Sequence, residues 1–146
     1  WIERQDEGSS PLMYYPWNRT REALERLSTG EGGSPYDGVL MEYTNPSTGG
    51  HVMPTIACFV QLLRPGERTK AHRHTTSSVY HVVEGKGHTM VGDIKLNWEN
   101  KDTFCVPGWS FHEHVNESPT EPAFLFSYTD TPVLNALGFF REEPKP

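Results

Sequence analysis

The sequence predicts an all-β fold, a double-stranded β-helix or jelly-roll barrel, with short flanking helices at both ends. Three observations support this prediction. A chain of 146 residues suits one domain with one core. From His51 onward, short runs of β-branched and aromatic residues end at Gly, Pro, Asn or Asp, as antiparallel strands do. Closing such strands into a barrel removes exposed sheet edges.

The N-terminal part, residues 1–35, is predicted to be a linker followed by one helix. The first ten residues are rich in charge and read as a linker. Residues 18–27 place Ala23, Leu24 and Leu27 at helical spacing, with Asn18 or Thr20 available as the N-cap. Glycines at 30, 32 and 33 then end the helix, and a loop or an edge strand is expected before His51.

The predicted barrel covers residues 36–130, and residues 131–146 are predicted to form a C-terminal helix and tail. The predicted strands are 53–63, 79–84, 88–91, 94–98, 103–106, 111–115 and 123–128. Glu84 to Gly87 is expected to form a hairpin turn. In the last segment, Pro132 is tolerated in a first helical turn and Gly138 is a natural stop.

Composition excludes several function classes. A net charge of -6 and a pI near 5.6 argue against a nucleic-acid partner, which would require a basic face. No apolar stretch is long enough to cross a membrane, and residues 1–20 do not have the layout of a signal peptide, so we expect a cytoplasmic protein. Cys58 and Cys105 lie in apolar runs and are expected to be reduced, buried thiols.

Histidines form the most informative pattern in the chain. His72 and His74 are two residues apart, so on a strand both rings project from one face and can converge on one metal ion. The pair alone is weak evidence, because many such pairs are solvated. His51, His81 and His88 have no comparable surroundings, and His81, which should point away from the face of Tyr80, is expected to be structural.

The frame around the pair resembles the two motifs of the cupin superfamily. Gly66, His72, His74 and Gly85 match the first motif, and Pro107, His112 and Asn116 match the second. The resemblance implies that His72, His74 and His112 are metal ligands. Ser78 stands where the first motif has its glutamate, so a site built from three neutral imidazoles would leave a divalent cation largely uncompensated. Such a site should favour an anionic, chelating substrate.

Longer stretches are similar to the gentisate 1,2-dioxygenase family, which includes salicylate and 1-hydroxy-2-naphthoate dioxygenases. The similar stretches are residues 71–85, 106–114 and 130–138. The resemblance implies the C-terminal cupin of a bicupin, which uses Fe(II) and dioxygen to open the ring of a small hydroxylated aromatic carboxylate. It also implies a second cupin domain as partner, and a homo-oligomer.

The same resemblance assigns roles to four further residues. His114 follows the third ligand by two residues and is a candidate catalytic acid-base group, although an ordinary interior histidine explains it equally well. Gln61, Tyr80 and Trp109 are candidate substrate-binding residues, with core packing as the alternative for Trp109. Tyr80 occupies the position of an arginine that pairs with the substrate carboxylate in the family, and Arg64, Arg68 or Arg73 could replace that arginine.

Three functions therefore stand side by side. The first is an Fe(II)-dependent ring-cleaving dioxygenase domain. The second is a cupin half that keeps its metal but serves structure and assembly, which the tyrosine at position 80 favours. The third is a stand-alone cupin with another activity, because a fold alone does not determine chemistry.

Overall fold

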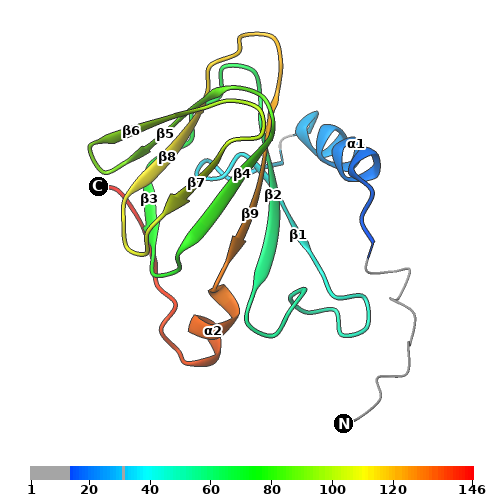
Figure 1. Ribbon diagram of the computed structural model, residues 1–146, viewed down its shortest axis with the longest axis vertical. Coiled ribbons are helices and arrows are strands. Elements are labelled where there is room, and N and C mark those ends of the chain that lie inside the picture. The colour runs from blue at the N-terminus through cyan, green and yellow to red at the C-terminus, as the bar shows by residue number, and fades with distance from the viewer. Residues whose placement is uncertain (1–13, 31) are drawn as a thin grey trace.

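The computed structural model describes residues 14–30 and 32–146, and in it two five-stranded antiparallel sheets face each other (Figure 1). The first sheet has the order β1 (Val39–Tyr43), β2 (Ala57–Leu63), β9 (Ala123–Thr129), β4 (Ser78–Glu84), β7 (Thr103–Val106). The second has the order β10 (Glu142–Pro144), β3 (His72–His74), β8 (His112–Asn116), β5 (Gly87–Val91), β6 (Ile94–Trp98). This arrangement confirms the predicted all-β barrel.

The interior of the barrel has an apolar end and a polar end. Leu63, Val82 and Leu125 lie on neighbouring strands of the first sheet and belong to one buried cluster, which Trp98 joins from the second sheet. Two residues further along each strand, the same face carries the buried polar side chains of Gln61 and Ser127, and also Tyr80, which belongs to the apolar cluster and adds a hydroxyl group. Because side chains on one face recur every second residue, the strands lead from a sealed core to a polar cavity.

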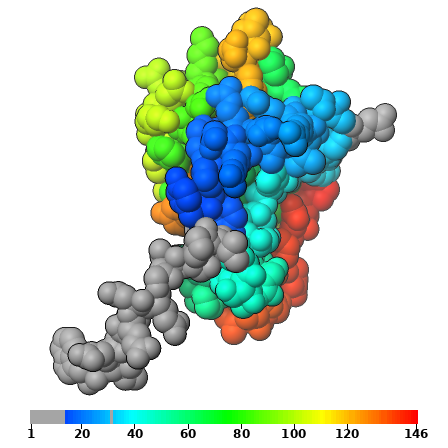
Figure 2. Space-filling model, turned by 90° about the vertical axis from the view of Figure 1, so that its right-hand side faces the viewer, coloured from blue at the N-terminus to red at the C-terminus, as the bar shows by residue number. Residues whose placement is uncertain are grey.

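Helix α1 (Trp17–Ser28) covers the outer face of the first sheet (Figure 2). Leu24 packs against Val60 and Phe124, and the indole of Trp17 meets the Phe124 ring edge-on at 5.2 Å between centroids. The helix confirms the prediction for residues 18–27, but the predicted N-cap is wrong. Pro16 is the N-cap and no side chain caps the helix, because Asn18 and Thr20 already lie within its first turn.

The C-terminal segment contains one predicted and one unpredicted element. Helix α2 (Thr131–Ala136) starts with a proline in its first turn, and Gly138 follows it at a φ of 71°, as predicted. Strand β10, which the prediction left in the tail, then pairs antiparallel with β3. This pairing brings the end of the chain beside His72 and His74.

Several local predictions are corrected by the structure. Strand β2 begins at Ala57 rather than at residue 53, because residues 52–55 bend and the Met53 amide donates to the Ile56 carbonyl. The turn between Glu84 and Gly87 is no hairpin, since it carries the chain from β4 in the first sheet to β5 in the second. The undecided stretch before His51 contains the edge strand β1.

The two cysteines are less buried than the sequence predicts. Both cysteines are free thiols, but Cys58 is only half-buried and Cys105 is exposed, which contradicts the expected burial. Cys105 faces out because β7 is an edge strand with one covered face. Among the described residues, no helix has the length and apolar character needed to span a membrane. The charged linker predicted for the first ten residues lies outside the described residues.

Candidate metal centre

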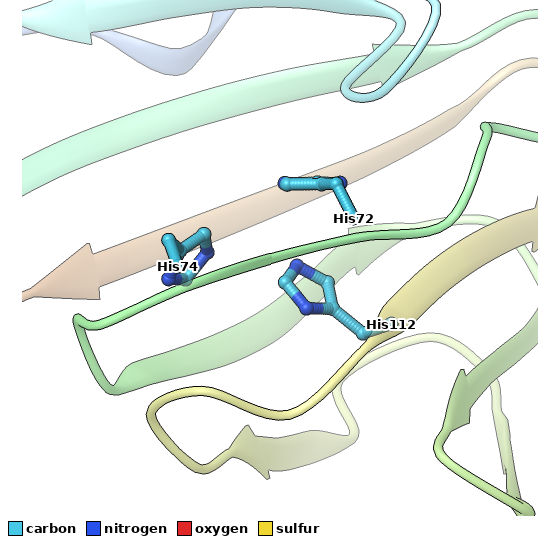
Figure 3. A group of neighbouring side chains, drawn as sticks. All are labelled: His72, His74 and His112. Atoms are coloured by element: carbon cyan, nitrogen blue, oxygen red, sulfur yellow. The ribbon is translucent and has the colours of Figure 1, made fainter. Parts of the chain in front are cut away.

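His72, His74 and His112 meet at the polar end of the barrel (Figure 3). His72 and His74 project from the same face of β3, and His112 opens β8 directly opposite His72 in the antiparallel register. Ring centroids are 4.5 Å apart for His72 and His112, 5.6 Å for the two histidines of β3, and 4.9 Å for the remaining pair. One nitrogen of each ring lies within 4.8 Å of the others. The structure therefore brings the three residues together.

Hydrogen bonds orient two of these rings and leave nitrogen lone pairs free. The Nδ1 atoms of His74 and His112 donate to the backbone carbonyls of Thr76 and Ser110, each at 3.0 Å. A neutral ring that donates through Nδ1 keeps its lone pair on Nε2, the state that binds a metal. Among the described residues, His112 Nε2 and His72 Nδ1 are buried without a hydrogen-bond partner.

Burial keeps two of the candidate ligands, His74 and His112, uncharged. Removal from water lowers the pKa of His112 to about 3 and also lowers the pKa of His74. For both rings the positive charge of neighbouring histidines acts in the same direction. Metal binding requires neutral imidazole, so these two rings need not lose a proton to bind a cation at neutral pH.

The lowered pKa of His112 predicts acid sensitivity of the metal-free protein. The unfolded chain takes up a proton near pH 6.5, whereas the folded ring does so only near pH 3. The free energy of unfolding should therefore fall between pH 6.5 and pH 3, by about 1.4 kcal/mol per pH unit for this ring. Urea unfolding of metal-free protein at pH 7 and pH 5 measures the effect. His112→Gln should reduce the slope by about one proton, and an unchanged slope contradicts the prediction.

A cavity of about 230 Å³ lies beside the histidines, between the two sheets. Gln61 and Ser78 face it with buried polar atoms, Gln61 Nε2 and Ser78 Oγ, that have no hydrogen-bond partner among the described residues. Unpartnered buried donors are costly, so they indicate a polar ligand or water at this position. The other side chains that line the cavity are Asp37, Leu40, Phe59, His72, His74, Thr76, Tyr80, Ser127, Thr129, Thr131, Phe140 and Glu142.

Tyr80 and His114 form the wall behind the metal site. The Tyr80 ring stacks on Phe104 at 5.1 Å, and its centroid lies 4.8 Å from that of His114. Burial raises the pKa of Tyr80, so its phenol stays protonated and can donate one hydrogen bond into the cavity. Tyr80 thus lies where the sequence analysis placed it, beside the candidate ligands.

His114 is fully buried and is held by a short relay of hydrogen bonds. Trp98 Nε1 donates to Thr89 Oγ1 at 3.0 Å, and Thr89 Oγ1 lies 2.8 Å from His114 Nδ1. The threonine hydroxyl accepts from the indole and still has its own proton and a second lone pair, so it can pair with either tautomer of His114. Burial lowers the pKa of His114 well below the usual value, so the ring is neutral. It lies behind His112 at 5.7 Å and is not among the residues that line the cavity.

Trp109 and the arginines lie outside the cavity. Trp109 is 40% exposed, and the guanidinium of Arg73 stacks 4.3 Å from its ring. Arg73 also pairs with Glu143, while Arg64 and Arg68 pair with Glu67 and Glu113. The structure therefore brings neither Trp109 nor a replacement arginine to the site. His51, His81 and His88 bond to Glu42, Thr103 and Glu117, away from the cavity.

Two acidic residues reach the site without having been predicted from the sequence. Asp37 precedes β1 and Glu142 lies on β10, and a carboxylate oxygen of each is 3.8 Å from His72 Nε2. Asp37 follows Ser34 in a turn, which is a common place for aspartate and gives no sign of a site. Glu142 lies in a segment with no strand pattern. Neither position could be connected with His72 before the fold was known.

The chain is similar to a known domain family and to several known enzymes. The family model described as "Cupin domain" matches residues 59–128. A 5-aminosalicylate 1,2-dioxygenase of Comamonas sp is 48% identical over 91% of this chain and 35% of its own length. A gentisate 1,2 dioxygenase 1 of Aquipseudomonas alcaligenes is 45% identical over 92% of this chain and 38% of its own length.

Solved structures point to the same group of proteins. The crystal structure of a salicylate 1,2-dioxygenase from Pseudaminobacter salicylatoxidans matches with a TM-score of 0.81 and 31% identity, over 89% of this chain and 38% of that one. A structure of that enzyme with gentisate matches with a TM-score of 0.80 over 90% of this chain and 36% of that one. The chain thus spans little more than a third of the relatives it matches.

Proposed function

The chain belongs to the cupin family and its homologues are gentisate-type ring-cleaving dioxygenases, and from this premise we propose that it is an Fe(II)-dependent dioxygenase domain for a hydroxylated aromatic carboxylate. The observation that carries the proposal is the three-histidine cluster at the polar end of the cavity. We further propose that it works with a second cupin domain, because the homologues are more than twice as long. A homo-oligomer is proposed from the family resemblance alone.

The donor set suits iron. His72, His74 and His112 would hold the ion through ring nitrogens, and two of these rings carry buried nitrogen atoms that no described protein group satisfies. Imidazole nitrogen is a preferred donor for Fe(II), and three ligands from two adjacent strands leave further positions open. When bound, Fe(II) supplies the redox chemistry with dioxygen that a closed-shell aromatic substrate needs.

The cavity side chains would bind and orient the substrate. A volume of about 230 Å³ is below the usual range of about 300–1,000 Å³ for drug-sized ligands, which suits a single substituted ring. Gln61 Nε2 and the Tyr80 phenol can donate hydrogen bonds to hydroxyl or carboxylate oxygens of that ring. Phe59 and Leu40 supply an apolar surface for its face.

His114 is proposed as an acid-base group that acts from behind the ligands. The hydrogen bonds from Trp98 to Thr89 and between Thr89 and Nδ1 fix the position of its ring, and the ring is uncharged. A neutral imidazole can both donate and accept a proton, as general acid-base chemistry requires. Trp109 has no part in this proposal, since it lies on the outside of the barrel.

A second candidate function is a metal-retaining cupin half that serves structure and assembly. The charges around the cavity favour it. Its described lining contains two carboxylates, on Asp37 and Glu142, and no lysine or arginine. An anionic substrate would therefore rely on the metal for charge compensation, because the Tyr80 phenol offers one neutral hydrogen bond where a guanidinium offers two charged ones.

Oxygen uptake separates the two functions. The protein is loaded anaerobically with Fe(II), mixed with gentisate, salicylate, 5-aminosalicylate or 1-hydroxy-2-naphthoate, and then exposed to dioxygen in an oxygen electrode. The dioxygenase function predicts uptake of one dioxygen per ring opened with at least one acid, and none with His72→Ala. If the iron-loaded protein consumes no oxygen with any of the four acids, the proposal that this chain is catalytic is wrong. That result supports the structural function instead.

A further inference from the structure

Two carboxylates from distant parts of the chain converge on the first histidine of the site. Asp37 Oδ1 and Glu142 Oε1 are each 3.8 Å from His72 Nε2, and both side chains line the cavity. His72 is 3% exposed, whereas the two carboxylates are partly exposed. We propose that Asp37 and Glu142 supply the carboxylate charge of the metal centre that the missing motif glutamate would otherwise provide.

The residue at the position of that glutamate cannot supply the charge. This residue is Ser78, which lies on β4 across the cavity. Its buried hydroxyl has no hydrogen-bond partner among the described residues. Serine is neutral at any ordinary pH and is a poor ligand for a divalent cation. Without another source of negative charge, three neutral imidazoles would leave the full charge of the ion in a poorly solvated cavity.

Both carboxylates are available for this role. Asp37 accepts a hydrogen bond from Ser34 Oγ at 3.0 Å through Oδ2, which leaves Oδ1 directed at His72. Glu142 is placed by the ladder between β10 and β3, where it lies opposite His74. In the described part of the chain, neither carboxylate forms an ion pair with a lysine or arginine. Their charge is therefore not already compensated.

The distances allow two arrangements with the same consequence. Two ligand atoms that each lie about 2.1 Å from one ion are at most about 4.2 Å apart, so 3.8 Å would allow a carboxylate to share an ion with His72 Nε2. Neither carboxylate belongs to the group of atoms, from His72, His74 and His112, that all lie within 4.8 Å of one another, so sharing one ion with all three rings would require the carboxylate to move closer. If His72 binds through its unpartnered Nδ1 instead, the two carboxylates 3.8 Å from Nε2 favour a proton on that atom through their charge and make the ring a stronger donor. In both cases neutralising the carboxylates weakens metal binding.

The inference rests on the proposed metal centre, and metal affinity tests it without relying on turnover. The dissociation constant for Fe(II), and for Mn(II) as an air-stable probe, is measured by competition with a chelator. The variants are Asp37→Asn, Glu142→Gln and the double substitution. Each single change should weaken binding about 10-fold, and the double change about 100-fold, the range found for groups that support metal ligands. The moderate size reflects the partial exposure of both side chains.

Glu143→Gln is the matched control, because Glu143 lies on the same short strand and pairs with Arg73 instead of facing the cavity. It should bind metal within about twofold of the unsubstituted protein, by the scatter expected for exposed charges. Thermal unfolding of each metal-free variant shows that it is folded. If the double variant is folded and binds as tightly as the unsubstituted protein, the inference is wrong. If the unsubstituted protein binds no metal, the proposed function itself fails.

Discussion

His72→Ala is expected to abolish metal binding by the protein. The substitution removes one of three nitrogen donors from a site whose remaining rings sit 4.9 Å apart. Loss of a supporting group costs about 10–100-fold in metal affinity, so loss of a ligand should cost more than about 100-fold. The measurement is metal content after Fe(II) loading and gel filtration, with one equivalent expected in the unsubstituted protein and none in the variant.

Thermal unfolding distinguishes loss of a ligand from loss of the fold. Metal at 100 times its dissociation constant raises the free energy of unfolding of a protein that binds it by about 2.7 kcal/mol. The unsubstituted protein should show this increase, and the His72→Ala variant should not. The metal-free variant should remain folded, because His72 Nδ1 makes no hydrogen bond with a described residue. His81→Ala is the control, since His81 bonds to Thr103 outside the cavity and should leave metal binding unchanged. A His72→Ala protein that retains a full equivalent of metal contradicts the assignment.

The parts of this structure that could be predicted from the sequence are those set by local rules. The alternation of side chains along a strand places His72 and His74 on one face, and the same rule separates buried Tyr80 from its neighbour His81. Proline and glycine mark the ends of α2 in the same local way. Each of these signals depends only on residues that are close in sequence. It therefore does not depend on how distant segments pack together.

The unpredicted parts depend on contacts between distant segments. Glu142 lies near His72 only because β10 pairs with β3. The three residues of β10 have no alternation of apolar and polar side chains that would predict a strand. Trp109 was expected in the cavity from the resemblance to the dioxygenase family. It adopts a positive φ of 61° in a tight loop and stacks under Arg73 on the surface. Arg73 in turn pairs with Glu143 rather than facing the substrate.

The turn from Glu84 to Gly87 shows why Gly87, two residues after the motif glycine Gly85, needs a structural explanation of its own. The sequence suggested a hairpin, whereas the chain here leaves one sheet and enters the other. Crossing between sheets brings the backbone at Gly87 against β8 and against the indole that closes the apolar end of the barrel. Glycine is required at position 87 because the backbone there lies so close to Val115 and Trp98 that a side chain would not fit. The sequence rules for hairpin turns do not predict this contact.

Gly87→Ala is therefore expected to destabilise the whole barrel. A Cβ at this position would lie 1.9 Å from the Val115 carbonyl oxygen and 2.6 Å from the Trp98 ring. The indole cannot swing aside without losing its hydrogen bond to Thr89, and the Val115 carbonyl belongs to the strand that carries His112. Relief requires β5 and β8 to separate, which should cost about 3 kcal/mol or more and lower Tm by about 10 °C.

Gly50→Ala provides the comparison, because a Cβ there would approach nothing nearer than Thr48 Oγ1 at 3.6 Å. Thermal unfolding of the metal-free proteins should show little change for that variant and a large fall for Gly87→Ala. Because β8 also carries His112, the surviving folded fraction of Gly87→Ala should bind metal more weakly, which the chelator competition measures. A Tm close to that of the unsubstituted protein would mean that the strands yield more easily than close packing implies.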